Sequence, residues 1–225
     1  MQHPKTCAII VAAGKSTRMG IDKQRISIGQ KTVIERCINN FQQSKYIDFI
    51  VIVTAQESIE YITSIATSKV FAVITGGASR QASVQLGIQA VPADTEFIAI
   101  HDGARPFASP VFIDTLCECA YRDGAAVPVI PITSTVKQIH ANGTILSTID
   151  REDLRLVQTP QVFDIQQYKQ ALAHANGMDY TDDCQLFEKM NMPVTWINGD
   201  ERNIKITTPH DLLLAQLIEK RMDEA

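Results

Sequence analysis

The sequence predicts an α/β fold in which a mostly parallel sheet is covered by helices on both faces. Short apolar runs rich in Val and Ile alternate with stretches of helical periodicity along most of the chain. Several of these runs are followed by small residues or glycine, as a ligand-binding edge of such a sheet requires. With 225 residues and 45% hydrophobic content, we expect a single domain over residues 1–225, with one β-arm at about 133–155.

The expected strands are short β-branched runs bounded by polar or turn residues. In chain order they are 7–11, 49–53, 70–74, 97–100, 125–129 and 194–197, with a short extended piece at 204–206. The expected helices carry apolar residues at spacings of three and four. In chain order they are 32–44, 58–66, 79–91, 110–121, 166–175, 183–190 and 209–222. The last of these begins with Thr208 as N-cap and Pro209 at its first position.

One stretch interrupts this alternation. Two segments of alternating polarity, 135–140 and 144–149, are joined by Asn142-Gly143, which is a strong hairpin signal. The apolar positions 136, 139, 145 and 149 need a cover, so we expect the hairpin to project and to meet a partner subunit. The alternative is a hairpin that folds back on its own domain.

Composition excludes several classes of protein. The formal charge is 21 − 25 = −4, so no global basic field indicates a nucleic-acid partner. No apolar stretch is long enough to span a bilayer and no signal-peptide pattern opens the chain, so we expect no membrane association. The five cysteines form no CxxC pair and keep no zinc-like spacing to the histidines, which indicates free thiols in a reducing cytoplasm.

The segment after the first strand has the features of a polyphosphate cradle. Ala12-Ala13-Gly14 allows the backbone to approach a ligand, because no bulky side chain intervenes. Lys15, Arg18 and Lys23 bring three cations to the same strand end. The alternative is an ordinary strand-to-helix turn with surface lysines.

Two better-known phosphate motifs are excluded in this segment. A P-loop needs a glycine where Ile9 stands inside the strand. The dinucleotide fingerprint needs a second glycine where Ser16 stands.

Two later strand ends add chemistry. Asp102 follows the strand at 97–100, and one carboxylate beside several cations suits Mg²⁺, which binds one or two carboxylates plus phosphate oxygens. Arg105 can form a bidentate contact with a phosphate, whereas His101 is expected to pack at the strand end. The alternative for Asp102 and Arg105 is a turn with a surface ion pair.

Gly76-Gly77 follows another strand and precedes a helix. Free backbone groups at this position can contact a flat ring or a sugar, and Ser83 lies one helical turn beyond Ser79 to add a side-chain contact. The same pattern caps many helices, so this segment alone is a weak signal.

Seven segments occur in one order: AAGKSTRMG with the trailing DKQ, GGASRQASV, HDGARPF, TIDR, QTPQ, TDD and NIKIT. In this order the chain resembles, over nearly its whole length, the 2-C-methyl-D-erythritol 4-phosphate cytidylyltransferases of the non-mevalonate isoprenoid pathway. The resemblance implies a Rossmann-like nucleotidyltransferase fold and a homodimer that exchanges β-arms. It implies transfer of CMP from CTP to the polyol phosphate, with Mg²⁺ or another hard divalent cation as cofactor and pyrophosphate as product.

The resemblance also implies roles for individual residues. The catalytic cations would be Arg18, Lys23 and Lys205. The nucleotide-binding residues would be Ala12, Ala13, Gly14, Lys15, Gly77, Ser83 and Asp102, with Asp102 also the metal ligand. The acceptor-binding residues would be Arg105, Thr135, Arg151, Thr159 and Thr181, of which Arg151 and Thr159 would reach the neighbouring subunit's site.

Two alternatives stay open at this point. A ribitol-5-phosphate cytidylyltransferase making CDP-ribitol shares the same cradle; Ser134 stands where aspartate is usual, while the run 149–151 favours methylerythritol phosphate. A non-catalytic nucleotide sensor would have lost the metal carboxylate or the phosphate cations, yet all four such residues are present: Asp102, Arg18, Lys23 and Lys205. A phosphate oxygen is already anionic near neutral pH, so its attack on CTP needs cations and alignment rather than a general base.

Overall fold

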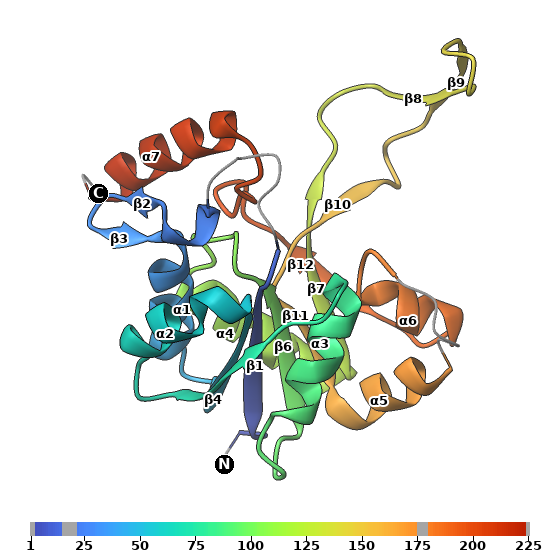
Figure 1. Ribbon diagram of the computed structural model, residues 1–225. Helices are drawn as coiled ribbons and strands as arrows, with labels where there is room; N and C mark the ends of the chain where they lie inside the picture. The colour runs from blue at the N-terminus through green and yellow to red at the C-terminus, as the bar shows by residue number, and fades with distance from the viewer. Residues whose placement is uncertain (1–2, 15–21, 175–179, 224–225) are drawn as a thin grey trace.

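The computed structural model describes residues 3–14, 22–174 and 180–223. Within these ranges the main sheet has eight strands in the order β10-β7-β11-β6-β1-β4-β5, with β12 paired to β7 (Figure 1). The strands are β1 (Thr6–Ala12), β4 (Phe49–Thr54), β5 (Val70–Thr75), β6 (Phe97–Asp102), β7 (Ala125–Pro131), β10 (Arg155–Val157), β11 (Gln161–Asp164) and β12 (Thr195–Asn198). Pairs along β6-β1-β4-β5 are parallel, whereas β11 and β10 run antiparallel to their neighbours. The predicted mostly parallel α/β sheet is confirmed.

The register of the central strands brings three of their carboxyl ends together. Val11 of β1 lies opposite Val53 of β4 on one side and Asp102 of β6 on the other. These strands are almost fully buried, as expected for a parallel sheet with both faces covered. The segments that follow β1 and β6 therefore start from one edge of the sheet.

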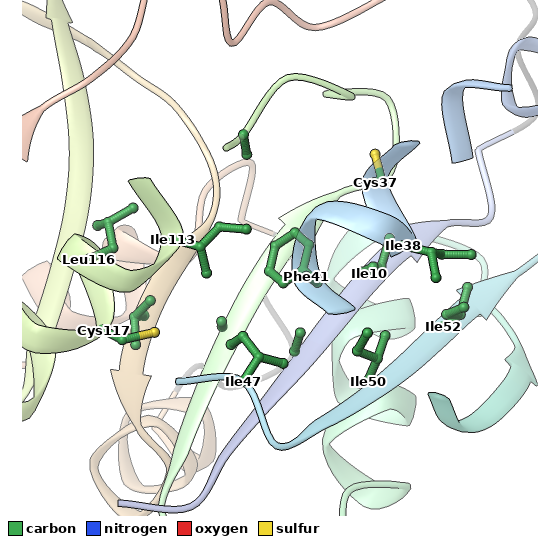
Figure 2. Close-up of a cluster of buried hydrophobic side chains, with 14 of the residues drawn as sticks. Ile10, Cys37, Ile38, Phe41, Ile47, Ile50, Ile52, Ile113, Leu116 and Cys117 are labelled. Carbon is green, nitrogen blue, oxygen red and sulfur yellow. The ribbon is translucent and has the colours of Figure 1, made fainter. Parts of the chain in front are cut away.

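Helices cover both faces of the sheet. They are α1 (Val33–Gln43), α2 (Ile59–Ser64), α3 (Arg80–Gln89), α4 (Pro110–Asp123), α5 (Ile165–Ala173), α6 (Cys184–Lys189) and α7 (Pro209–Asp223). On one face, α1, α2 and α4 pack around a core that includes Phe41, Ile52 and Leu116 (Figure 2). On the other face, α3, α5 and α6 pack around Ile9 and Phe163. No helix in the described ranges combines the length and the apolar character that crossing a bilayer requires.

The structure differs from the predicted elements at several places. Strands β10 and β11 were not predicted, because each is three or four residues long and pairs with strands distant in sequence. The expected piece at 204–206 is not a strand, although the Ile206 N–H donates to the Ala104 carbonyl (2.9 Å). Two short elements, a 3₁₀ turn at Lys23–Arg25 and the pair β2 (Ser27–Ile28) and β3 (Lys31–Thr32), precede α1.

The arm forms a separate two-stranded sheet that projects from the body of the molecule (Figure 1). Its strands are β8 (Val136–Ile139) and β9 (Ile145–Ile149), and Gly143 turns the chain with φ +86°. Ile139 lies opposite Ile145, and the two side chains are 67% and 65% exposed. The hairpin does not fold back on its own domain: Ile139 and Ile145 stay exposed within one chain, whereas Val136 and Ile149 near the base are half-buried.

Candidate active site

A cavity of about 390 Å³ lies at the carboxyl ends of β1 and β6, beside the first turn of α3. Its lining residues are Val11, Ala13, Gly14, Lys23, Gln24, Gly77, Ala78, Ser79, Arg80, Ser83, Asp102, Ala104 and Lys205. It therefore brings together seven of the residues expected at the site, which come from four separate parts of the sequence.

The loop after β1 forms one wall of the cavity. A Cβ atom at Gly14 would meet nothing within 4 Å, so the backbone is open to a ligand there. Ala12 is buried at the strand end and lies behind the lining residues. Lys23 begins the 3₁₀ turn that Asp22 caps through the Gln24 N–H (3.0 Å). Lys15 and Arg18, two further expected site residues, lie outside the described residues.

The glycine pair between β5 and α3 forms the opposite wall. A Cβ atom at Gly76 would lie 2.3 Å from the Ala13 Cβ, so the two loops approach each other more closely than any other residue allows. The Ser83 hydroxyl accepts from the Gly77 N–H (3.1 Å) and donates to the Ser79 carbonyl (2.9 Å). Ser83 thus shapes the loop that presents Gly77 to the cavity.

Asp102 lies on the cavity floor among three cations. Lys205 Nζ is 2.8 Å from its Oδ2, Arg80 Nε is 3.1 Å from its Oδ1, and Arg105 Nε is 3.8 Å from Oδ2. Burial by itself raises the pKa of this carboxyl group, but Lys205, Arg80 and Arg105 together hold the pKa well below its usual range. Asp102 is therefore ionised at neutral pH and is the charge around which the cations gather.

A buried hydrogen-bonded layer beneath the floor fixes the backbone of Asp102. The Asp102 N–H donates to Thr159 Oγ1 (3.0 Å), which lies 3.1 Å from His101 Nδ1. His101 Nε2 lies 2.9 Å from the Arg105 carbonyl, which can only accept, so Nε2 carries the proton and the Thr159 hydroxyl donates to Nδ1. Burial lowers the pKa of His101 to about 4, and the imidazole is neutral. His101 packs at the strand end, as the sequence predicts.

The segment that carries Lys205 is fastened to the same layer. Asn203 donates through Nδ2 to the Thr159 backbone carbonyl (2.8 Å), and the backbone carbonyl of Asn203 accepts from Arg105 Nη1 (2.8 Å). Arg105 is thus occupied beside the floor and does not line the cavity. Thr159 is only 5% exposed, and its hydroxyl is used by Asp102 and His101. Its place beneath the floor differs from the expected one at a neighbouring subunit's site.

Arg80, Asp183 and Tyr168 are site residues that sequence reasoning did not assign. Arg80 begins α3 and donates through Nη1 to Asp183 Oδ2 (2.7 Å), while the Tyr168 hydroxyl donates to Asp183 Oδ1 (2.6 Å). A signal was available for Arg80: it is an arginine at a helix N-terminus, three residues after the Gly76-Gly77 pair, where a cation is unfavourable unless it has a partner. Asp183 lies in the TDD segment, but nothing local indicates its partners.

The remaining expected acceptor residues lie elsewhere in this chain. Thr135 and Arg151 share a shallow hollow at the base of the arm, where Arg151 Nη1 donates to the Thr133 carbonyl. Thr181 is exposed just before α6. None of the three lines the cavity, so one chain alone does not bring the arm residues to Asp102.

The arrangement is suited to holding a polyanion. Cations and backbone groups of two strand-end loops face a single carboxylate. Within the described residues, no group of three or more His, Cys, Asp or Glu side chains forms a metal cluster. A hard cation at this site would therefore share its coordination sphere between Asp102 and oxygens of the ligand.

Comparisons with known proteins agree with this geometry. A family model described as 2-C-methyl-D-erythritol 4-phosphate cytidylyltransferase matches residues 6–221. A protein of that name from Dehalococcoides mccartyi is 42% identical over 97% of this chain and 98% of its own length. One from Geobacillus kaustophilus is 40% identical over 96% and 98%. Among solved structures, a 4-diphosphocytidyl-2C-methyl-D-erythritol synthase from Anaerococcus prevotii has a TM-score of 0.86 at 29% identity, with 97% of each chain covered.

Proposed function

The chain belongs to the 2-C-methyl-D-erythritol 4-phosphate cytidylyltransferase family, and from this premise we propose how its residues perform the reaction. The enzyme transfers CMP from CTP to 2-C-methyl-D-erythritol 4-phosphate, giving 4-diphosphocytidyl-2-C-methyl-D-erythritol and pyrophosphate. The observation that carries the proposal is Asp102, ionised on the floor of a cavity and flanked by Lys205 and Arg80.

CTP binds between the two strand-end loops in this proposal. Gly77 and the loop shaped by Ser83 contact cytosine mainly through backbone groups. Ala13, Gly14, Lys15, Arg18 and Lys23, with Ala12 behind them, hold the triphosphate. The support for this orientation is the open backbone at Gly14 and the cavity-lining position of Lys23.

Asp102 fits a magnesium ion. Its Oδ2 already contacts a cation, the Lys205 ammonium, and a carboxylate plus phosphate oxygens is a donor set that Mg²⁺ accepts. When bound, the ion neutralises phosphate charge. Within the described residues the protein adds no further cluster of metal ligands, so the phosphates of CTP complete the site.

The residues of this chain act on two reactants that repel each other. Arg18 and Lys23 neutralise charge that develops as pyrophosphate leaves, and Lys205 receives the phosphate of the acceptor. That phosphate attacks the α-phosphorus of CTP directly, so no general base is needed. The neutral, buried His101 supports this assignment, because it stays beneath the floor as a hydrogen-bonding spacer.

The acceptor site requires two copies of the chain in this proposal. Each chain is one domain with a β-arm at about 133–155, and the arms of a homodimer exchange. Thr135 and Arg151 of one copy then contact the acceptor held near Arg105 and Thr181 of the other, with Thr159 supporting the floor. The supporting observations are the projecting arm and its uncovered isoleucines.

All five cysteines are buried free thiols, which supports a reducing compartment.

The direct test is pyrophosphate release with alternative acceptors. Purified protein is given CTP and Mg²⁺ with either 2-C-methyl-D-erythritol 4-phosphate or ribitol 5-phosphate. We expect release with the first acceptor only. Release with ribitol 5-phosphate alone would overturn the acceptor, and CTP binding without release from either would favour the nucleotide sensor.

A further inference from the structure

Arg80 links the floor of the cavity to a buried carboxylate outside it. Its guanidinium donates through Nε to Asp102 Oδ1 (3.1 Å) and through Nη1 to Asp183 Oδ2 (2.7 Å). Asp183 is 3% exposed and does not line the cavity, so it cannot touch a substrate there. Among the described residues, the contact that links Asp183 to the cavity is its hydrogen bond with Arg80.

Asp183 is itself fixed at both oxygens. Oδ2 accepts from Arg80, and Oδ1 accepts from the Tyr168 hydroxyl (2.6 Å). Tyr168 is fully buried, with its ring 5.4 Å from that of Phe163 and 6.3 Å from that of Phe187. An aromatic ring packed in this way has one orientation, so its hydroxyl determines how the carboxylate faces Arg80.

The arrangement divides the two oxygens of Asp102. Arg80 occupies Oδ1, whereas Oδ2 lies 2.8 Å from the Lys205 ammonium and 3.8 Å from Arg105 Nε. Without a second anchor, the long side chain of Arg80 would lose this orientation, because a single ion pair does not hold all its rotatable bonds. Two carboxylates bound at two edges of the planar guanidinium do hold the side chain in one orientation.

We propose that Asp183 and Tyr168 are positioning residues for the transfer: they hold Arg80 so that it fixes Oδ1 of Asp102 and leaves Oδ2 to Lys205 and to a metal ion that Asp102 would bind. The inference rests on the proposed role of Asp102 as metal ligand. It gives a function to the TDD segment: Asp183 acts on Asp102 through the Arg80 side chain and does not contact the substrate.

Two substitutions test the proposal. Tyr168→Phe keeps the packed ring and removes only the hydroxyl. Arg80→Lys keeps the charge but loses the planar guanidinium, which presents Nε to Asp102 and Nη1 to Asp183. The matched controls are Tyr46→Phe, which removes a hydrogen bond to the Glu118 carboxylate (2.7 Å), and Arg122→Lys, which alters an exposed ion pair. Neither control residue lines the cavity.

The measurements separate positioning from general damage. Mn²⁺ binding to the protein–CTP complex without acceptor is followed by electron paramagnetic resonance, and the rate is measured against Mg²⁺ and against acceptor concentration. We expect Arg80→Lys to weaken Mn²⁺ binding roughly 10- to 100-fold and Tyr168→Phe about threefold. The KM for the acceptor stays within about twofold, and both controls behave as wild type.

The outcomes distinguish this inference from the proposed function. Unchanged Mn²⁺ binding in both variants, or an equal loss in metal and acceptor parameters, would overturn the positioning role. If Tyr168→Phe fails to fold by circular dichroism, Arg80→Lys at the cavity wall decides alone. Asp102→Asn serves as the reference: if it binds Mn²⁺ as wild type does, the proposed metal ligand is wrong, whatever the other variants do.

Discussion

The floor of the cavity and the β-arm are built in opposite ways. On the floor, Asp102 is 8% exposed and has three cations within 4 Å, and the groups beneath it, His101 and Thr159, satisfy one another. On the arm, Ile139 and Ile145 are 67% and 65% exposed. The cavity is thus assembled by one chain, whereas the exposed isoleucines of the arm fit the proposed contact with a second copy.

The largest effect is expected from breaking the floor at its centre. Asp102→Asn removes the counter-charge of three cations and the proposed metal ligand, so pyrophosphate release should fall by about 10³-fold or more. Circular dichroism controls for folding. A variant that keeps a tenth of wild-type turnover would contradict the assignment.

Lys23 tests the wall of the cavity next to the floor. Lys23→Ala should cut turnover between about 10²- and 10³-fold with the fold intact, because the residue lies on a short 3₁₀ turn rather than in the sheet. Lys31→Ala on the nearby β3 is the matched control, since Lys31 is exposed and does not line the cavity. Near-normal turnover of Lys23→Ala would remove Lys23 from the mechanism.

The floor and the arm each carry a histidine, His101 and His140, and we expect only the buried His101 to make the free energy of unfolding depend on pH. Burial lowers the pKa of His101 to about 4, so below about pH 6.5 the unfolded chain binds a proton that the folded one does not. Stability is therefore lost as the pH falls, by about 2 kcal/mol between pH 7.5 and 5. Urea unfolding across this range measures it.

The control for this experiment lies on the arm. His140 is exposed at the tip of the hairpin, and His140→Asn should leave the pH dependence as in wild type. A flat stability profile in wild-type protein would show that His101 is accessible to protons in the folded state.

The smallest effect is expected from the arm. Replacing Ile139 and Ile145 with Ser should weaken self-association about tenfold, or about 1.4 kcal/mol, because apolar area that a partner would cover is lost. The free energy of unfolding of the isolated chain should hardly change, since both side chains are already exposed. Sedimentation velocity over a dilution series measures the association, and a monomeric wild-type protein would refute arm exchange.

The sequence predicted those features that depend on local pattern. Strands such as β1 and β4 are β-branched runs, and α1 begins at Val33 after the N-cap Thr32, which forms a capping box with Glu35. The segments after β1, β5 and β6 that converge on the cavity were found because each follows a strand, and parallel strands end at one edge. Lys205 was assigned from the family resemblance alone. By contrast, β11 was missed because its pairing with β6 joins residues about sixty positions apart.

The unpredicted part of the site is also long-range. Arg80 and Asp183 are 103 positions apart, and no local pattern indicates that an arginine at a helix start would meet a buried carboxylate there. The burial of Thr159 and its hydrogen bond with the Asp102 N–H follow likewise from tertiary packing, which no local pattern indicates. The residue types indicated the chemistry of the site, but the pairs of side chains that contact each other could be identified only from the fold.

The route of the backbone between the two regions has a consequence for how this chain tolerates insertions. The returning limb of the arm leaves at Arg151, passes through β10 and delivers Thr159 to its place beneath Asp102. An added residue at the Asn142-Gly143 turn lengthens only an exposed tip. The same addition between 151 and 159 would displace Thr159 from Asp102 or move the base of the arm relative to the cavity, so we expect length variation to be confined to the tip.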